Sequence, residues 1–327
     1  MKVLTDWDVD WTFFLSVGAI LSSTALAYGY AHFELGAKDS EDTEGEEEIA
    51  KIDSPLRYSL NDPEISRELP TKLREVSGLV VNPAGGIGWA INDEEGLVFE
   101  LDLQTGMVRS NFAFGTPGDY EAIETLGDKS LVVARSDGTL FHIRKNKGRK
   151  QVREIASPLD KEADVEGLAY DPERERLLVA CKGRAGKARR FRKAKAVFAV
   201  SLPRFQWDEE PLFLIRDKDI EDYLDDYPIE GIDPDEATKF APSAIAVHPE
   251  SGEIYMLSTR ARLLIVVDNY GEILGMAPLS REVHRQPEGL SFDADGRLYI
   301  SNEGRGKSAA IHMFPRDMIA RADDPRP

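Results

Sequence analysis

The sequence contains little of the chemistry that builds disulfide frameworks or zinc sites. Its 327 residues include one cysteine, Cys181, and five histidines. One cysteine cannot form an internal disulfide, and the apolar residues before Cys181 indicate an inert thiol on a strand. His142, His248, His284 and His312 show no ligand spacing with one another or with the cysteine. The sequence therefore gives no indication of a zinc centre.

Positive charge is also scarce, because the formal net charge is −18 at pH 7. Proteins that bind nucleic acids generally need a surplus of lysine and arginine to displace counterions from phosphates. The chain has no Gly-x-Ser-x-Gly nucleophile elbow and no phosphate-binding glycine-rich loop. We therefore expect no nucleic-acid partner, and the common hydrolase and nucleotide-binding signatures are missing.

Charged residues are absent from one stretch near the N-terminus, Trp11–Phe33, which is long enough to cross a bilayer as a transmembrane helix. A buried core helix is the alternative. The segment Ala25–Ala27 resembles a signal-peptidase site, whereas three aspartates before the span favour an uncleaved anchor. We expect the protein at the cell membrane with its main domain facing the periplasm or the exterior, or secreted if the segment is cleaved.

The composition divides the chain into four segments. Residues 1–33 form a membrane anchor or signal segment, and residues 34–54 form an acidic linker with too little apolar content to order itself. Residues 55–316 form the folded domain, and residues 317–327 form a C-terminal tail.

A five-residue motif returns five times along the folded domain. Its copies are Glu75–Leu79, Asp119–Ile123, Asp164–Leu168, Ala241–Ile245 and Gln286–Leu290. The third residues of successive copies lie 44, 45, 77 and 45 positions apart, and a four-stranded propeller blade uses about 45 residues. Turn residues and apolar runs follow each copy, as expected for antiparallel strands. The fold class is therefore an all-β, five-bladed β-propeller.

Two features of this propeller need separate explanations. The long third interval contains a basic stretch, residues 182–195, and an acidic one, residues 208–239, so we expect two insertions in blade three; a sixth blade is the alternative. Blade five lacks a fourth strand, and Leu56–Leu60 is predicted to fill this position and close the ring.

The motif also predicts a functional face. The first strand of each blade lines the channel, and the second strand returns antiparallel to the same mouth. We expect the metal ligands Glu121, Glu166, Glu288 and Asn302 at this mouth. Further candidates there are Ser77, Asn92, Arg135, Ser243 and Glu303.

Three carboxylates on a narrow axis repel one another, so each must be protonated, paired or bound to a metal. The oxygen-only ligands favour Ca²⁺, displaced from the axis toward blades two, three and five. One alternative is an ordinary ion-pair network, in which Arg135, Lys182, Arg260 or Arg262 neutralises the glutamates. Another is that each glutamate accepts hydrogen bonds from backbone amides at the start of its strand.

The basic stretch 182–195 also allows two interpretations. Its density of lysine and arginine is suited to anionic lipid or another polyanion. The acidic residues that follow in the same blade favour mutual charge compensation instead, although a partner-binding loop is a further option.

The order and spacing of these motifs resemble the SdiA-regulated domain family of bacterial envelope proteins. The resemblance covers Leu69 to Phe314 and rests on Val76–Leu79, Gly118–Ile123 with Leu131–Val133, Val165–Ala169, and Pro287–Leu290 with Leu298–Glu303. It implies a five-bladed propeller with a calcium site in the channel, often behind a membrane segment, and no established biochemical activity. The single motifs are also similar to those of NHL-repeat, gluconolactonase-like and phytase-like propellers.

The sequence thus predicts a monomeric, membrane-anchored, extracytoplasmic calcium-binding propeller that acts as a binding or scaffold module. Its partner is an unknown protein or small molecule. The alternative is a metal-dependent hydrolase of lactones or phosphoesters, in which a channel cation polarises the substrate and activates water. His284, four residues before Glu288, is able to approach the same mouth, although an isolated histidine in a loop is usually surface.

Overall fold

The computed structural model describes residues 58–127, 130–146 and 149–316. The predicted membrane segment, the acidic linker and the C-terminal tail lie outside these residues. Within the described ranges, no helix has both the length and the apolar character needed to cross a membrane.

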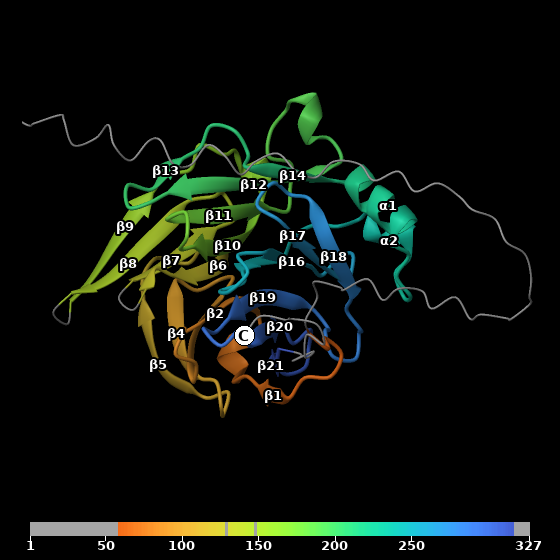
Figure 1. Ribbon diagram of the computed structural model, residues 1–327. Coiled ribbons are helices and arrows are strands. Elements are labelled where there is room, and N and C mark those ends of the chain that lie inside the picture. The colour runs from red at the N-terminus through yellow and green to blue at the C-terminus, as the bar shows by residue number, and fades with distance from the viewer. Residues whose placement is uncertain (1–57, 128–129, 147–148, 317–327) are drawn as a thin grey trace, which may run out of the picture. The chain divides into compact units, whose positions relative to one another are not determined.

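The described chain forms five antiparallel sheets, each of which is one blade (Figure 1). Blade one contains β2 (Val76–Val81), β3 (Ile87–Asn92), β4 (Leu97–Asp102) and β5 (Val108–Ala113), and blade two contains β6 (Tyr120–Thr125), β7 (Ser130–Arg135), β8 (Leu140–Asn146) and β9 (Arg149–Ile155). Blade three contains β10 (Val165–Asp171), β11 (Arg176–Cys181), β12 (Ala194–Ser201), β13 (Gln206–Trp207) and β14 (Phe213–Arg216). Blade four contains β15 (Ala244–Val247), β16 (Ile254–Ser258), β17 (Leu263–Val267) and β18 (Ile273–Pro278), and blade five contains β19 (Pro287–Phe292), β20 (Leu298–Asn302), β21 (Ala310–Phe314) and β1 (Ile65–Glu68).

The first strands of the blades form a closed inner ring. Each of β2, β6, β10, β15 and β19 contacts the first strand of both neighbouring blades, and β19 contacts β2 to complete the circle. These strands are almost fully buried, and the apolar core lies between successive sheets rather than on one axis. The five-bladed prediction is confirmed, and the six-bladed alternative is excluded by this closure.

The fourth position of the motif is glycine in blades one, three and five and alanine in the other two, which allows the inner strands to approach closely. A Cβ atom on Gly167 would lie 2.8 Å from Ile245 Cγ2 in blade four, and one on Gly289 would lie 2.8 Å from Leu79 Cβ in blade one. Such separations are shorter than van der Waals contact, so a larger residue would push neighbouring blades apart. The motif therefore encodes the spacing of the ring as well as the blade itself.

The strand that closes the ring is not the predicted one. β1 spans Ile65–Glu68 and pairs with β21, with Ile65 opposite Met313 and Glu68 opposite Ala310. The predicted segment Leu56–Leu60 begins outside the described residues, and its described part is no strand. β1 alternates between half-buried and exposed side chains, as an outer edge strand does, whereas Tyr58 and Leu60 are both buried.

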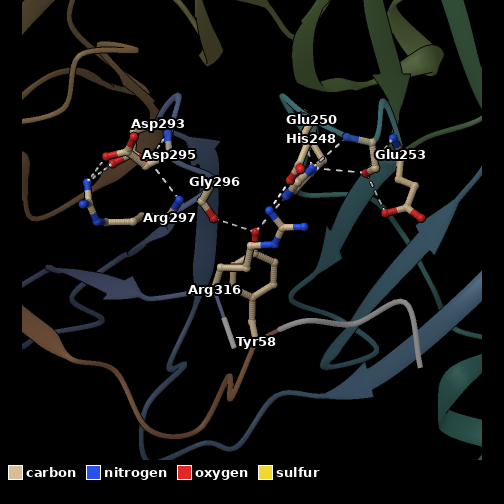
Figure 2. A network of polar contacts seen from close by, with 10 residues as sticks. Tyr58, His248, Glu250, Glu253, Asp293, Asp295, Gly296, Arg297 and Arg316 are labelled. Atoms are coloured by element: carbon tan, nitrogen blue, oxygen red, sulfur yellow. Dashed lines mark hydrogen bonds and ion pairs between the residues drawn. The ribbon is translucent and has the colours of Figure 1, made fainter. Parts of the chain in front are cut away.

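Tyr58 anchors the N-terminal segment between blades four and five (Figure 2). Its hydroxyl donates to the carbonyl of Gly296 at 2.6 Å and lies 3.1 Å from His248 Nε2. Its ring packs against Tyr255 and Phe292. Around this contact, Arg316 pairs with Glu250 and Arg297 pairs with Asp293, so polar bonds surround an aromatic plug.

Blade three contains both predicted insertions, but the acidic one is partly regular structure. Residues 208–239 include β14, which pairs with β12, followed by the helices α1 (Asp217–Asp226) and α2 (Pro234–Ala237). Ile220 and Leu224 of α1 are buried against the core shared by blades three and four. The apolar face of α1 explains why this acidic segment folds onto the sheet.

Candidate functional site

The third position of the motif is a β-bulge in four of the five blades. The pairing register shifts between the residues on either side of Ser77, Glu121, Glu166 and Glu288. A bulge leaves one residue out of the ladder and redirects its side chain. In blade four the corresponding Ser243 lies just before β15. The sequence therefore places one side chain per blade at one mouth of the ring.

The three glutamates do come together at this mouth. Glu121, Glu166 and Glu288 all line the narrow axial cavity, whose volume is about 10 Å³. Burial raises the pKa of Glu121 to about 9, and the nearby charge of Glu166 adds to this rise. Burial likewise raises the pKa of Glu288 to about 8, again with a contribution from Glu166. The three carboxyl groups therefore form one electrostatic unit.

Lys182 is the cation that approaches this unit. Its Nζ atom lies 2.5 Å from Glu166 Oε1, and its own position is fixed by Lys195, which donates to the Lys182 carbonyl. Burial raises the pKa of Glu166 to about 7, and the ion pair with Lys182 limits the rise. The Lys182 charge also offsets part of the rise in the pKa values of Glu121 and Glu288. One of the four basic residues predicted as neutralisers is therefore found in that role.

The two serines of the motif have a structural part that the sequence did not indicate. Ser77 Oγ donates to the carbonyl of Tyr120 at 2.7 Å, and Ser243 Oγ donates to the carbonyl of Pro287 at 2.8 Å. Each acceptor directly precedes a glutamate of the next blade, Glu121 or Glu288. The serines therefore hold the backbone that positions these carboxyl groups.

Two of the predicted mouth residues, Asn92 and Arg135, have partners other than the three glutamates of the motif. Asn92 accepts from the Glu95 backbone N–H at 3.0 Å and donates to the Glu95 carboxylate at 3.1 Å, which completes a turn. Arg135 pairs with Asp137 at 2.7 Å and lies over the ring of Phe141. Asn92 also donates to the Lys72 carbonyl at 3.3 Å, so both side chains have partners other than the three glutamates of the motif.

Asn302 and Glu303 lie at the end of β20 beside a second cavity of about 220 Å³. Asn302 is 3% exposed, and neither polar atom of its side chain has a hydrogen-bond partner among the described residues. Burial and the charges of Asp93 and Glu75 raise the pKa of Glu303, whereas Arg305 lowers it. Such an orphaned amide is the kind of group that a cation or water would satisfy.

These donors fit calcium in type but not in their present arrangement. Carboxylate and amide oxygens are what Ca²⁺ takes, and the mouth offers both. However, no three His, Cys, Asp or Glu side chains of the described residues are close enough together to hold a metal ion. Lys182 pairs with Glu166, and Asn302 lines the second cavity rather than the axial one.

His284 does not take part in this site. It is fully buried, its Nε2 atom lies 2.7 Å from the Leu60 carbonyl, and burial lowers its pKa to about 4. His284 is thus neutral at physiological pH and holds the N-terminal segment against the loop before β19.

A large cavity at this mouth, about 610 Å³, has a different character. Lys182 and Glu288 lie in its lining, and most of its other charged residues are basic. Of these, Arg281, Arg285, Arg305 and Lys307 had not been predicted. The available signal was positional: they flank the motif and the end of β20, where antiparallel strands return to the mouth.

Comparisons with known proteins agree with this architecture. No curated protein matches the sequence. Among solved structures, a glutaminyl cyclase from Myxococcus xanthus matches with a TM-score of 0.51 and 12% identity over 77% of this chain and 94% of its own. A PQQ-bound aldose sugar dehydrogenase from Streptomyces coelicolor matches with a TM-score of 0.44 and 14% identity over 77% and 99%. At such identities, the cyclase shows the fold alone. The SdiA-regulated family matches residues 62–305, most of the described propeller, so the chain belongs to the SdiA-regulated family.

Proposed function

We propose that this propeller is a binding or scaffold module whose working surface is the mouth at the third motif position. We further propose that residues 1–33 anchor it in the cell membrane with the propeller outside the cytoplasm. One observation carries the proposal: blades two, three and five each direct a carboxyl group to the same narrow cavity, with Glu166 buried and Glu121 and Glu288 half-buried. Buried, mutually repelling groups of this kind are retained at functional sites more often than elsewhere.

Calcium is the proposed ligand of these carboxyl groups. The charges support it, because three carboxyl groups lie near the ammonium of Lys182, which forms its ion pair with Glu166. The side chain of Lys182 is 43% exposed, whereas that of Glu166 is 8% exposed. The lysine thus reaches in from solvent on a flexible stem and is able to withdraw when a divalent ion binds. The ion would replace both the lysine and the protons that the raised pKa values of Glu121 and Glu288 favour.

The test is calcium titration of the full chain by calorimetry, in a mild non-ionic detergent at pH 8. We expect saturable binding that Glu121→Gln and Glu288→Gln each weaken by about tenfold or more, since each removes a charged ligand. Glu272→Gln, an exposed acid on blade four, is the matched control. Absence of calcium binding, or equal binding by all four proteins, would contradict the calcium proposal.

A metal-dependent hydrolase is the second candidate, and one observation favours it. Glu288 lines both the axial cavity and the large cavity, so a carboxyl group with a pKa of about 8 meets a space of substrate size. Such a pKa suits a general acid or base near neutral pH. Turnover of lactones or phosphomonoesters that requires a divalent ion and disappears in Glu288→Gln would replace the scaffold proposal.

A further inference from the structure

The large cavity at the channel mouth is lined mainly by positive charge, although the chain as a whole is strongly negative. The chain carries a formal charge of −18, yet the cavity wall is built mainly from cations of blades four and five. The six at its rim are Arg260, Arg262, Arg281, Arg285, Arg305 and Lys307. Glu288 is the one carboxylate among the described lining residues, and it lies beside Lys182 at the channel end. The electrostatic potential inside the cavity is therefore expected to be positive.

Most of these cations have no anionic partner. The side chains of Arg260, Arg281, Arg285 and Lys307 make no hydrogen bond or ion pair within the described ranges. The cations of the wall repel one another. Burial lowers the pKa of Arg262, and the charges of Arg281 and Arg305 lower it further. Like charges gathered in a concave wall are unfavourable without a counter-charge.

The wall is also held in place by bonds that do not use these free groups. Arg262 donates to the carbonyls of Leu279 at 3.0 Å and His284 at 2.6 Å, which fixes the loop between β18 and β19. Arg305 bonds to the side chain of Gln286. Arg262 and Arg305 both have left-handed backbones, with φ of 56° and 42°. The backbone of the cavity wall is therefore fixed before a ligand binds, whereas the exposed side chains of Arg260, Arg281, Arg285, Arg305 and Lys307 would be ordered by the ligand.

We propose that this cavity binds a small organic polyanion through its phosphate or carboxylate groups. A volume of about 610 Å³ is that of a small-molecule site rather than of a surface for a polymer. Arginine forks bind oxyanions in bidentate geometry, and several forks around one cavity suit a ligand with two or more anionic groups. This proposal gives the ligand class of the binding role proposed above and does not depend on calcium.

The test is calorimetric titration of the full chain in detergent with pyrophosphate, with citrate and with uncharged glucose, in EDTA at 150 mM salt. We expect saturable binding of pyrophosphate, of citrate or of both, and none of glucose; the better anion identifies the head group. Arg260→Gln and Arg281→Gln should each weaken binding by about tenfold, because each removes a charge-assisted hydrogen bond. Neither side chain makes a hydrogen bond or ion pair within the described residues, and each removal relieves repulsion among the cations, so neither variant should unfold below the wild-type temperature.

Arg192→Gln is the matched control, because Arg192 is an exposed cation outside the cavity lining. The proposal is overturned if neither anion binds, if the control weakens binding as much as the two variants, or if binding appears only when calcium replaces EDTA. Loss of calcium binding in a separate titration, with anion binding retained in EDTA, would sink the calcium proposal and leave this one intact.

Discussion

At the scale of single residues, the third position of the motif has two roles, depending on whether it is serine or glutamate. Ser77 and Ser243 donate to backbone carbonyls of the next blade, whereas the glutamates supply charge. Because a hydroxyl is neutral, the serines hold the ring together without adding to the repulsion at the mouth. The repulsion at the mouth is therefore limited to the three glutamates, Glu121, Glu166 and Glu288.

The raised pKa of Glu121 makes a pH dependence of stability that can be measured. Its pKa is about 9 in the folded chain and near 4.5 in the unfolded one, so the folded state holds a proton that the unfolded state has lost. The resulting stabilisation is complete below pH 4.5 and is lost as the pH rises through 9. Glutamine keeps the shape of the protonated acid and does not ionise, so Glu121→Gln should gain in Tm relative to wild type as the pH rises.

We expect this gain to reach about 2–6 °C between pH 5 and pH 9, measured by thermal unfolding in EDTA. The exposed acid Glu272 provides the comparison, and Glu272→Gln should show a constant difference from wild type. A gain for Glu121→Gln that is flat with pH would show that the carboxyl group is not buried in the way described.

At the scale of elements, the inner strands combine a bulge with a glycine. The bulge directs the third residue of the motif to the mouth, and the glycine or alanine after it allows the adjacent strand to approach. Gly289 has the tightest surroundings: an added Cβ would clash with Ser301 Oγ and would lie 2.9 Å from the Leu79 backbone nitrogen. At Gly78 the nearest atom, the Ile123 nitrogen, is 3.1 Å away.

These distances predict a graded pair of glycine substitutions. Gly289→Ala should lower the free energy of unfolding by about 1–3 kcal/mol, because a backbone on the opposite strand cannot rotate away. Gly78→Ala should cost less than about 1 kcal/mol, because the smaller overlap is offset by a more restricted unfolded chain. Chemical denaturation measures both, and a larger loss for Gly78→Ala would contradict the described packing of the ring.

At the scale of the whole propeller, closure depends on two separate N-terminal contacts. β1 completes blade five by pairing with β21, and Tyr58 plugs the space between blades four and five (Figure 2). Both contacts join residues more than 200 positions apart in sequence. The ring therefore closes only when the two ends of the folded domain have met.

This closure predicts a large effect from Tyr58. Tyr58→Ala should lower the free energy of unfolding by about 3–5 kcal/mol, because it leaves a cavity among His248, Tyr255 and Phe292. Tyr58→Phe should cost about 1 kcal/mol, since it keeps the ring and removes one hydroxyl donor. Tyr270→Ala is the control, because the Tyr270 side chain is 87% exposed. Equal losses for Tyr58→Ala and Tyr270→Ala in chemical denaturation would show that the plug does not stabilise the propeller.

Sequence reasoning succeeded where a pattern repeats and failed where a contact occurs once. The motif recurs in every blade, so its spacing identified the blades, the inner strands and the mouth where the glutamates meet. β1 occurs once and has few apolar residues, whereas Tyr58 and Leu60 are apolar and gave a stronger strand signal. The partners of Asn92 and Arg135 are local turn contacts, which strand periodicity does not report.

The repeat and its glutamates were thus determined by the sequence alone, because a 45-residue period and the alternation of strands are local properties of the chain. Tertiary structure decided which charges meet. Lys182 follows β11 and meets Glu166 on the paired strand β10 of the same blade, whereas the arginines at residues 260–262, 281–285 and 305 come from three separate loops of blades four and five. Coulomb interactions depend on distance in space, so the sequence offered Lys182 only as one of four candidate partners, and the cationic cavity does not follow from the net charge of −18.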